Sequence, residues 1–219
     1  MMKFLYPDIP WNTIKIVGFD VDGTLYDEFE FITQVYQPIA EKIASLSSNE
    51  MEEVKNVMLR KWLEKGSSYP FIFSETLVEM HVEENVQEEL IEQALRIFRA
   101  FVPVISLSER MKWILTELKE NYELFIVSDG SSQLQWNKIK SLKLENYVHK
   151  ENIFISGDHG RDTEKPGLTS LRMLPVFSKE YHAQEVVFFG DRLKDKQYAK
   201  NAGFYFIDIN ERGLANNCV

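Results

Sequence analysis

The stretch IKIVGFDVDGTLYD, residues 14–27, decides the fold of this chain. The run at 14–19 is short and rich in β-branched and aromatic residues, which predicts a buried strand. Asp-Gly-Thr at 22–24 predicts a turn. Residues two apart in a strand point to the same side, so Asp20 and Asp22 converge if strand geometry persists. Two like charges held together raise one pKa unless a cation lies between them. The end of this strand is therefore a candidate for chemistry.

The overall composition limits the class of protein. The chain has 219 residues, 44% of them hydrophobic and 27% charged, which is typical of a soluble globular protein. A net charge of −9 argues against a nucleic-acid or anionic-membrane partner. We find neither a signal-peptide pattern nor a stretch that approaches ~18 uncharged apolar residues. Cys218 is the single cysteine, so we expect a cytoplasmic protein without an intrachain disulfide.

Beyond Asp27 the pattern of the sequence changes. Segments 30–46, 50–66 and 86–101 carry apolar residues at helical spacing, and nothing nearby resembles a strand. Residues 28–105 contain 14 acidic and 7 basic residues, so they hold most of the net negative charge. We therefore expect an all-helical inserted domain at 28–105 and a core domain made of 1–27 and 106–219.

From residue 106 onward, predicted helices and strands alternate. Residues 106–120 predict an amphipathic helix with Ser106 as its N-cap, because Glu109 follows three residues later. Strands are predicted at 123–127, within 152–158, at 186–189 and at 204–209, with helical segments between them. Repeated strand–helix units predict a parallel sheet covered by helices on both faces. The predicted fold class is α/β, with a Rossmann-like core and an inserted all-helical domain.

Polar residues gather where the predicted strands end, which is where open parallel sheets bind their ligands. Clustered aspartates favour a hard divalent cation, and Mg²⁺ is the common choice when phosphate is also bound. Ser128 and Lys165 could hold phosphate oxygens, and one aspartate could attack phosphorus. The candidate site residues are Asp20, Asp22, Gly23, Thr24, Ser128, Asp129, Lys165, Asp191 and Asp195.

Four motifs in order carry a resemblance to a known family. DVDGTL at 20–25, VSDG at 127–130, KP at 165–166 and GDRLKD at 190–195 resemble the motifs of the haloacid dehalogenase-like superfamily. The resemblance covers roughly 14–27 and 106–210. The helical insert directly after the first motif is similar to the C1-type cap of that family. The resemblance thus implies a Rossmann-like core with a cap.

The resemblance also implies a mechanism. Asp20 would attack phosphorus to form an aspartyl-phosphate, while Asp22 would protonate the leaving group and then activate water. Mg²⁺ would be held by the Asp20 carboxylate, the Asp22 backbone carbonyl and Asp191, with Asp195 assisting. Dehalogenases of the superfamily lack an acid at the position of Asp22, because halide needs no proton. The resemblance therefore favours phosphate chemistry.

The phosphate-binding set and the departures from the family pattern complete the implied site. Phosphate would contact Gly23, Thr24, Ser128, Asp129 and Lys165. Asp129 stands where the family more often has Asn, so it brings a further negative charge. Asp191 and Asp195 are four residues apart, whereas many C1-capped relatives space these acids by five.

The expected function is hydrolysis of a small phosphorylated metabolite, such as a sugar phosphate or a nucleoside monophosphate, by a monomer or homodimer. Two alternatives stay open at this point. A phosphomutase would pass the phosphoryl group to a second hydroxyl. A catalytically weak relative would only bind a phosphometabolite.

Overall fold

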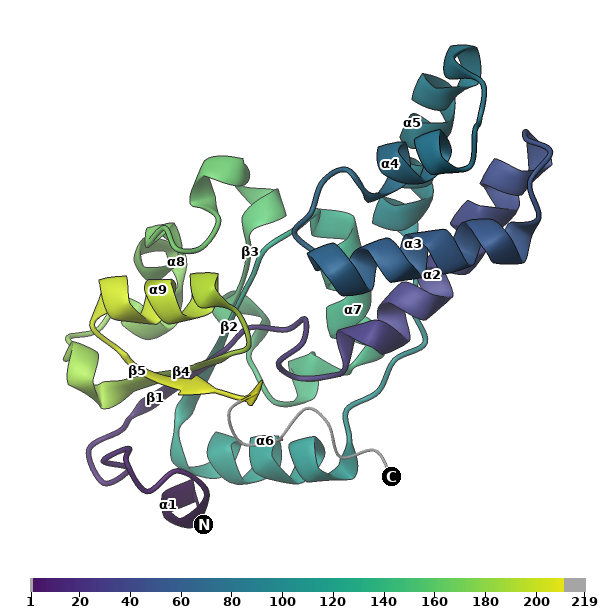
Figure 1. Cartoon of the computed structure of the whole chain (residues 1–219). Coiled ribbons are helices and arrows are strands. Elements are labelled where there is room, and N and C mark those ends of the chain that lie inside the picture. Colours follow the sequence, from purple (N-terminus) through teal and green to yellow (C-terminus); the bar gives the residue numbers. More distant parts are fainter. Residues whose placement is uncertain (1, 211–219) are drawn as a thin grey trace. The chain divides into compact units, whose positions relative to one another are not determined.

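The computed structural model describes residues 2–210 and divides them into two compact units (Figure 1). One unit joins the two ends of the chain, through Glu28 and from Ile105 onward, and the other runs from Phe29 to Val104. Cys218 lies outside the described residues. None of the described helices has both the length and the apolar character needed to cross a membrane.

The first unit is built on one five-stranded parallel sheet, which confirms the predicted α/β class. Its strands are β1 (Ile16–Phe19), β2 (Glu123–Ser128), β3 (Ile153–Ile155), β4 (Val186–Gly190) and β5 (Tyr205–Asp208). The spatial order is β3-β2-β1-β4-β5, so β1 lies at the centre. Ile16 is in register with Glu123 and with Val186, and the carboxyl ends of the three central strands therefore meet at one edge.

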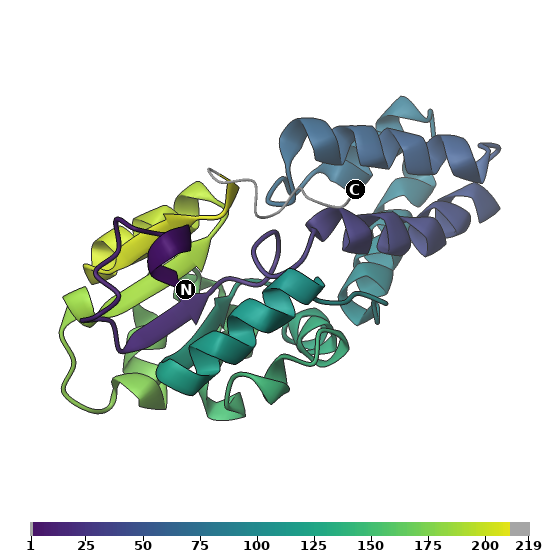
Figure 2. The same ribbon diagram turned by 90° about the horizontal axis from the view of Figure 1, so that it is seen from below.

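Helices cover the two faces of this sheet. They are α1 (Met2–Leu5), α6 (Glu109–Asn121), α7 (Ser132–Ser141), α8 (Thr169–Met173) and α9 (Leu193–Ala202). On one face, Phe125 and Phe188 pack with Tyr198 of α9. On the other, Phe19 stacks on Phe189, and α6 lies along the sheet (Figure 2). These apolar layers hold the strand ends in place.

The second unit is entirely helical in its described elements. Its helices are α2 (Glu28–Ser45), whose first residue belongs to the first unit, α3 (Met51–Lys65), α4 (Ile72–Glu79) and α5 (Glu84–Ala100). It has its own core, in which Phe31 packs edge-on against Phe98 and Tyr36 against Phe73. Phe31 and Tyr36 are buried and their partners are half-buried, and such aromatic pairs help to explain why the insert is a compact unit.

One local expectation was wrong. The helix predicted to be capped by Ser106 begins at Glu109, and its N-cap is Ser108, whose hydroxyl accepts from the Met111 N–H at 3.2 Å. Ile105 and Leu107 are both buried, so the chain stays extended through these alternating positions before the helix begins.

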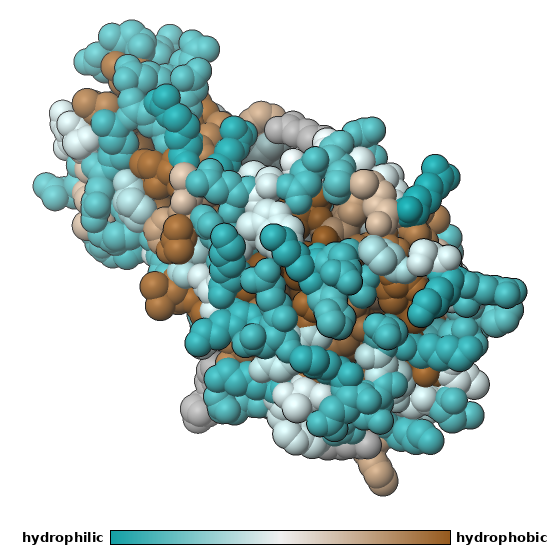
Figure 3. Space-filling view, turned by 180° about the vertical axis from the view of Figure 1, so that it is seen from behind, coloured by the Kyte–Doolittle hydropathy of each residue, from teal (hydrophilic) through white to brown (hydrophobic). Residues whose placement is uncertain are grey.

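On the face drawn in Figure 3, hydrophilic residues predominate and hydrophobic residues are scattered among them.

Candidate active site

The end of β1 places the first two acids. Asp20 follows the strand directly, and its N–H donates to the carbonyl of Phe189 in β4 at 2.9 Å. Asp20 and Asp22 are both buried. Gly23 then turns the chain with a φ of 75°, and a Cβ on it would lie 2.3 Å from Oδ2 of Asp191. Only glycine combines this backbone conformation with such a close approach.

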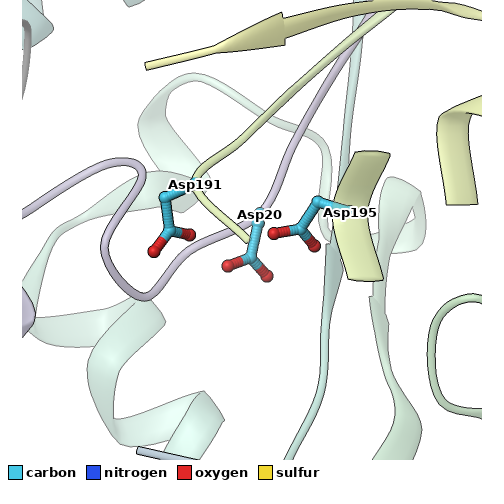
Figure 4. A group of neighbouring side chains, drawn as sticks. All are labelled: Asp20, Asp191 and Asp195. Atoms are coloured by element: carbon cyan, nitrogen blue, oxygen red, sulfur yellow. The ribbon is translucent and has the colours of Figure 1, made fainter. Parts of the chain in front are cut away.

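Three carboxylates converge beside this turn. One oxygen each from Asp20, Asp191 and Asp195 lies within 4.8 Å of the others, and Figure 4 shows the three side chains facing a common space. Asp191 follows β4, while Asp195 lies in the first turn of α9. Oδ2 of Asp195 accepts from the Arg192 backbone N–H at 3.1 Å, which orients the carboxyl despite its short spacing from Asp191.

The chemistry of these three carboxylates fits a divalent cation. Burial raises the pKa of Asp20 to about 7 and that of Asp191 to about 6, with the neighbouring carboxylate of Asp195 adding to both shifts. A cation among them would offset the cost of burying like charges. Oxygen ligands of this type are those that Mg²⁺ prefers. The cluster is therefore suited to Mg²⁺.

Lys165 joins the cluster from the loop before α8. Its Nζ donates to Oδ1 of Asp20 at 2.5 Å and to Oδ1 of Asp195 at 2.6 Å. The side chain is fully buried. Burial lowers the pKa of Lys165, but the two carboxylates outweigh burial and hold that pKa above its ordinary value. The ammonium is therefore charged where it touches Asp20.

The end of β2 contributes Ser128 and Asp129. Ser128 is buried, and its Oγ has no hydrogen-bond partner among residues 2–210. Oδ1 of Asp129 accepts from the Lys165 backbone N–H at 3.1 Å, and Oδ2 lies 2.8 Å from Nζ of Lys194. The extra acid in the second motif therefore anchors the loop that carries Lys165, and Lys194 neutralises its charge.

Asp22 is held by a different set of groups. Its Oδ1 accepts from the Tyr26 hydroxyl at 2.5 Å and from Nζ of Lys138 at 2.6 Å. Its Oδ2 accepts from Nε2 of Gln135 at 2.9 Å. Burial raises the pKa of Asp22, but Lys138 and these hydrogen bonds outweigh burial and hold that pKa below its usual range.

The remaining contacts balance the charge of the site. The Thr24 hydroxyl donates to Oδ1 of Asp191 at 3.2 Å, and Arg192 forms a 2.5 Å ion pair with Glu28. Six carboxylates and four cations thus meet around the site, for a formal charge of −2 that one divalent cation cancels. They are Asp20, Asp22, Glu28, Asp129, Asp191 and Asp195 with Lys138, Lys165, Arg192 and Lys194.

The structure brings most of the predicted site residues into contact, and it adds others that the sequence analysis missed. Asp20, Lys165, Asp191 and Asp195 form one cluster, to which Thr24 and Gly23 are joined through Asp191 and Asp129 through Lys165. The site residues that the sequence did not predict are Tyr26, Glu28, Gln135, Lys138, Arg192 and Lys194. For Gln135 and Lys138 a sequence signal existed, because helical spacing places them on the same side as the apolar Leu134 and Ile139.

Known proteins resemble the chain over most of its length. It is 27% identical over 192 residues to the glyceraldehyde 3-phosphate phosphatase of Pyrococcus furiosus, covering 87% of this chain and 78% of that protein. A HAD-superfamily hydrolase from Geobacter sulfurreducens has the same fold, with a TM-score of 0.66 and 24% identity over 90% of this chain and 87% of that one. The HAD-hydrolase YfnB from Bacillus subtilis, bound to magnesium, gives a TM-score of 0.65 and 20% identity over 91% and 88%.

Family membership follows from the match to a whole domain. Residues 17–209 match the model of the haloacid dehalogenase-like hydrolase family. This range includes all four motifs and the helical unit between the first two. The chain therefore belongs to the haloacid dehalogenase-like hydrolase family.

Proposed function

We propose that this protein is a Mg²⁺-dependent phosphatase that hydrolyses a small phosphorylated metabolite through an aspartyl-phosphate on Asp20. The observation that carries the proposal is the contact of Asp20 with a buried, charged lysine, beside two further carboxylates. A nucleophilic carboxylate needs positive charge nearby when it approaches an anionic phosphate. Relatives named as phosphatases support the same reaction type.

The cation would be held by carboxylate oxygens of Asp20, Asp191 and Asp195, together with the backbone carbonyl of Asp22. When bound, Mg²⁺ would keep these acids ionised and neutralise charge on the phosphoryl group. Lys165 would remain in contact with Asp20 and would bind the phosphoryl oxygens. Because Lys165 is also bound to Asp195, its position does not depend on substrate.

We assign the phosphate contacts to polar groups that can still form a hydrogen bond. The Ser128 hydroxyl has no partner among the described residues, so it would donate to a phosphoryl oxygen. The N–H of Gly23 would donate from the turn after β1. For Thr24 and Asp129 the phosphate-binding role stays a prediction, since the hydroxyl of Thr24 donates to Asp191 and Asp129 contacts Lys165 and Lys194.

The reaction would proceed in two steps. In the first, a carboxylate oxygen of Asp20 attacks phosphorus, and the bond from phosphorus to the ester oxygen breaks. Asp22, which has to take up a proton before this step because its pKa lies below the usual range, gives that proton to the ester oxygen. In the second, Asp22 takes a proton from water as the water oxygen attacks phosphorus, which releases Asp20 and inorganic phosphate. Asp22 would therefore act once as acid and once as base.

The relatives and the insert support the proposed substrate class. We propose that the helical unit, predicted at 28–105, is a C1-type cap that excludes water and selects small substrates. In the structure the separate unit comprises Phe29–Val104 and joins the core directly after the first motif. Glyceraldehyde 3-phosphate is the first substrate to test, because relatives over most of the chain are named for it.

The test is phosphate release from glyceraldehyde 3-phosphate and from a panel of sugar phosphates and nucleoside monophosphates, with Mg²⁺ and with EDTA. We expect Mg²⁺-dependent release that Asp20→Asn abolishes, while Asp8→Asn, a change of the same kind at an exposed turn, leaves it unchanged. Equal release in EDTA, or full activity of Asp20→Asn, would contradict the proposal. Conversion of a sugar phosphate into its isomer without phosphate release would identify a phosphomutase instead.

A further inference from the structure

Two buried polar side chains on α7 point at Asp22. Gln135 and Lys138 are three residues apart and therefore lie on the same side of the helix. Both are almost fully buried, although residues of these types are rarely buried unless they are paired. Their shared partner is Asp22, more than a hundred residues earlier in the chain.

Together with Tyr26, these residues surround the Asp22 carboxylate. Oδ1 receives two donors, the Tyr26 hydroxyl at 2.5 Å and the Lys138 ammonium at 2.6 Å, while Oδ2 receives the Gln135 amide at 2.9 Å. A carboxylate has about four acceptor positions. Donors from the described residues therefore occupy three, and the position left over is on Oδ2.

The Gln135 amide is itself fixed in orientation. Its Nε2 also donates to the backbone carbonyl of Asp129 at 3.1 Å, so a flipped amide would set oxygen against two acceptors. Gly130 has a φ of 133°, and a Cβ on it would lie 2.9 Å from Nε2, so the glycine makes room for the amide. Oε1 is buried without a hydrogen-bond partner among the described residues. An orphaned acceptor destabilises the fold, so stability alone does not explain this residue.

We propose that Gln135, Lys138 and Tyr26 are positioning residues that fix the orientation of the Asp22 carboxylate. In this orientation the free position on Oδ2 is available to exchange a proton first with the leaving oxygen and then with water. We call these three side chains the Asp22 clamp. The inference rests on the proposed function, in which Asp22 is the acid and base. The clamp acts through Asp22 and does not touch the phosphoryl group.

The clamp has a consequence that a purely structural role would not have. An alkoxide leaving group needs a proton as its bond to phosphorus breaks, whereas p-nitrophenolate leaves without one. Because kcat/KM measures the free-energy barrier from free enzyme and substrate, it isolates this first step. Losing the clamp should therefore lower kcat/KM much more for an alkyl phosphate than for p-nitrophenyl phosphate.

The experiment compares Gln135→Met, Tyr26→Phe and Lys138→Met, with Gln133→Met and Lys140→Met as exposed controls on the same helix. With Mg²⁺, we expect kcat/KM on glyceraldehyde 3-phosphate to fall about 10- to 100-fold in the clamp variants. On p-nitrophenyl phosphate it should fall less than about 3-fold, and the controls should match the wild type. Gln135→Met and Tyr26→Phe keep the test valid if Lys138→Met fails to fold.

A second measurement asks whether the clamp acts through Asp22. In an Asp22→Asn background, Gln135→Met should cause no further fall in kcat/KM, since residues that act as a unit are not additive. Equal losses on the two substrates, unchanged activity, or additive losses in the double variant would each overturn the clamp and leave the phosphatase proposal standing. A folded wild type inactive on both substrates with Mg²⁺ would overturn the proposed function and the clamp with it.

Discussion

Replacing Gly23 by alanine should separate backbone strain from loss of the metal site. The φ of 75° at Gly23 is left-handed, and an alanine there costs about 1–2 kcal/mol of unfolding free energy. Its Cβ would also lie 2.3 Å from Oδ2 of Asp191. A Cβ rarely approaches an oxygen more closely than about 3 Å, so the Asp191 carboxylate would have to move by roughly 0.7 Å. Mg²⁺ tolerates little deviation from octahedral geometry, and we expect about 10- to 100-fold weaker binding.

Gly66 provides the matched control. Its φ is 78°, close to that of Gly23, but a Cβ on it would meet nothing within 4 Å. Because its ψ is 167°, a conformation that essentially only glycine adopts, Gly66→Ala should lose unfolding free energy in urea through backbone strain alone. It should keep wild-type Mg²⁺ affinity. The affinity is measured by isothermal titration calorimetry on all three proteins. If Gly23→Ala binds Mg²⁺ as tightly as the wild type does, the reasoning about Asp191 is refuted.

Three further predictions concern the same cluster. Apparent Mg²⁺ affinity should fall about 10-fold or more from pH 8 to pH 6. The reason is that Asp20 and Asp191, with pKa values raised to about 7 and about 6, take up protons that the cation must displace. A constant affinity in calorimetry at the two pH values would contradict this. Lys165→Met should lower the unfolding free energy in urea by about 3–5 kcal/mol, since it leaves buried carboxylates without their cation; a loss no larger than that of the exposed control Lys179→Met would count against it. Ser128→Ala should lower kcat/KM about 10-fold or more through the lost hydrogen bond to phosphate, while stability in urea stays the same or rises because its Oγ has no partner; a stability loss without an activity loss would argue for a structural serine.

The sequence could predict the sheet and the central acids because both depend on local patterns. Short apolar runs predict buried strands, and the carboxyl ends of parallel strands meet at one edge. Asp20 and Asp191 each follow a strand directly, so the strand assignment places both at that edge, and the pairing of β1 with β4 in the structure brings them together. The predicted helical insert depends in the same way on apolar spacing within each segment.

Other features depend on distances between residues that are far apart in the chain, and the spacing of residues along the sequence does not reveal these distances. The local pattern favours Ser106 as the cap because Glu109 follows three residues later, but the burial of Leu107 selects Ser108. From the sequence, Asp129 adds a negative charge at a phosphate site, whereas in the structure Nζ of Lys194 lies 2.8 Å from its Oδ2. The clamp on Asp22 exists only because α7 packs behind the first motif.

By itself, the sequence determined the α/β class, the order of the strands along the chain and the motif residues that carry the chemistry, because these follow from period, turn signals and position at strand ends. Tertiary structure alone decided which charge neutralises which and which donors hold Asp22. The physical reason is that a buried charge is stable only beside a partner at hydrogen-bond distance. The packing of helices on the sheet sets that distance across more than a hundred residues of chain.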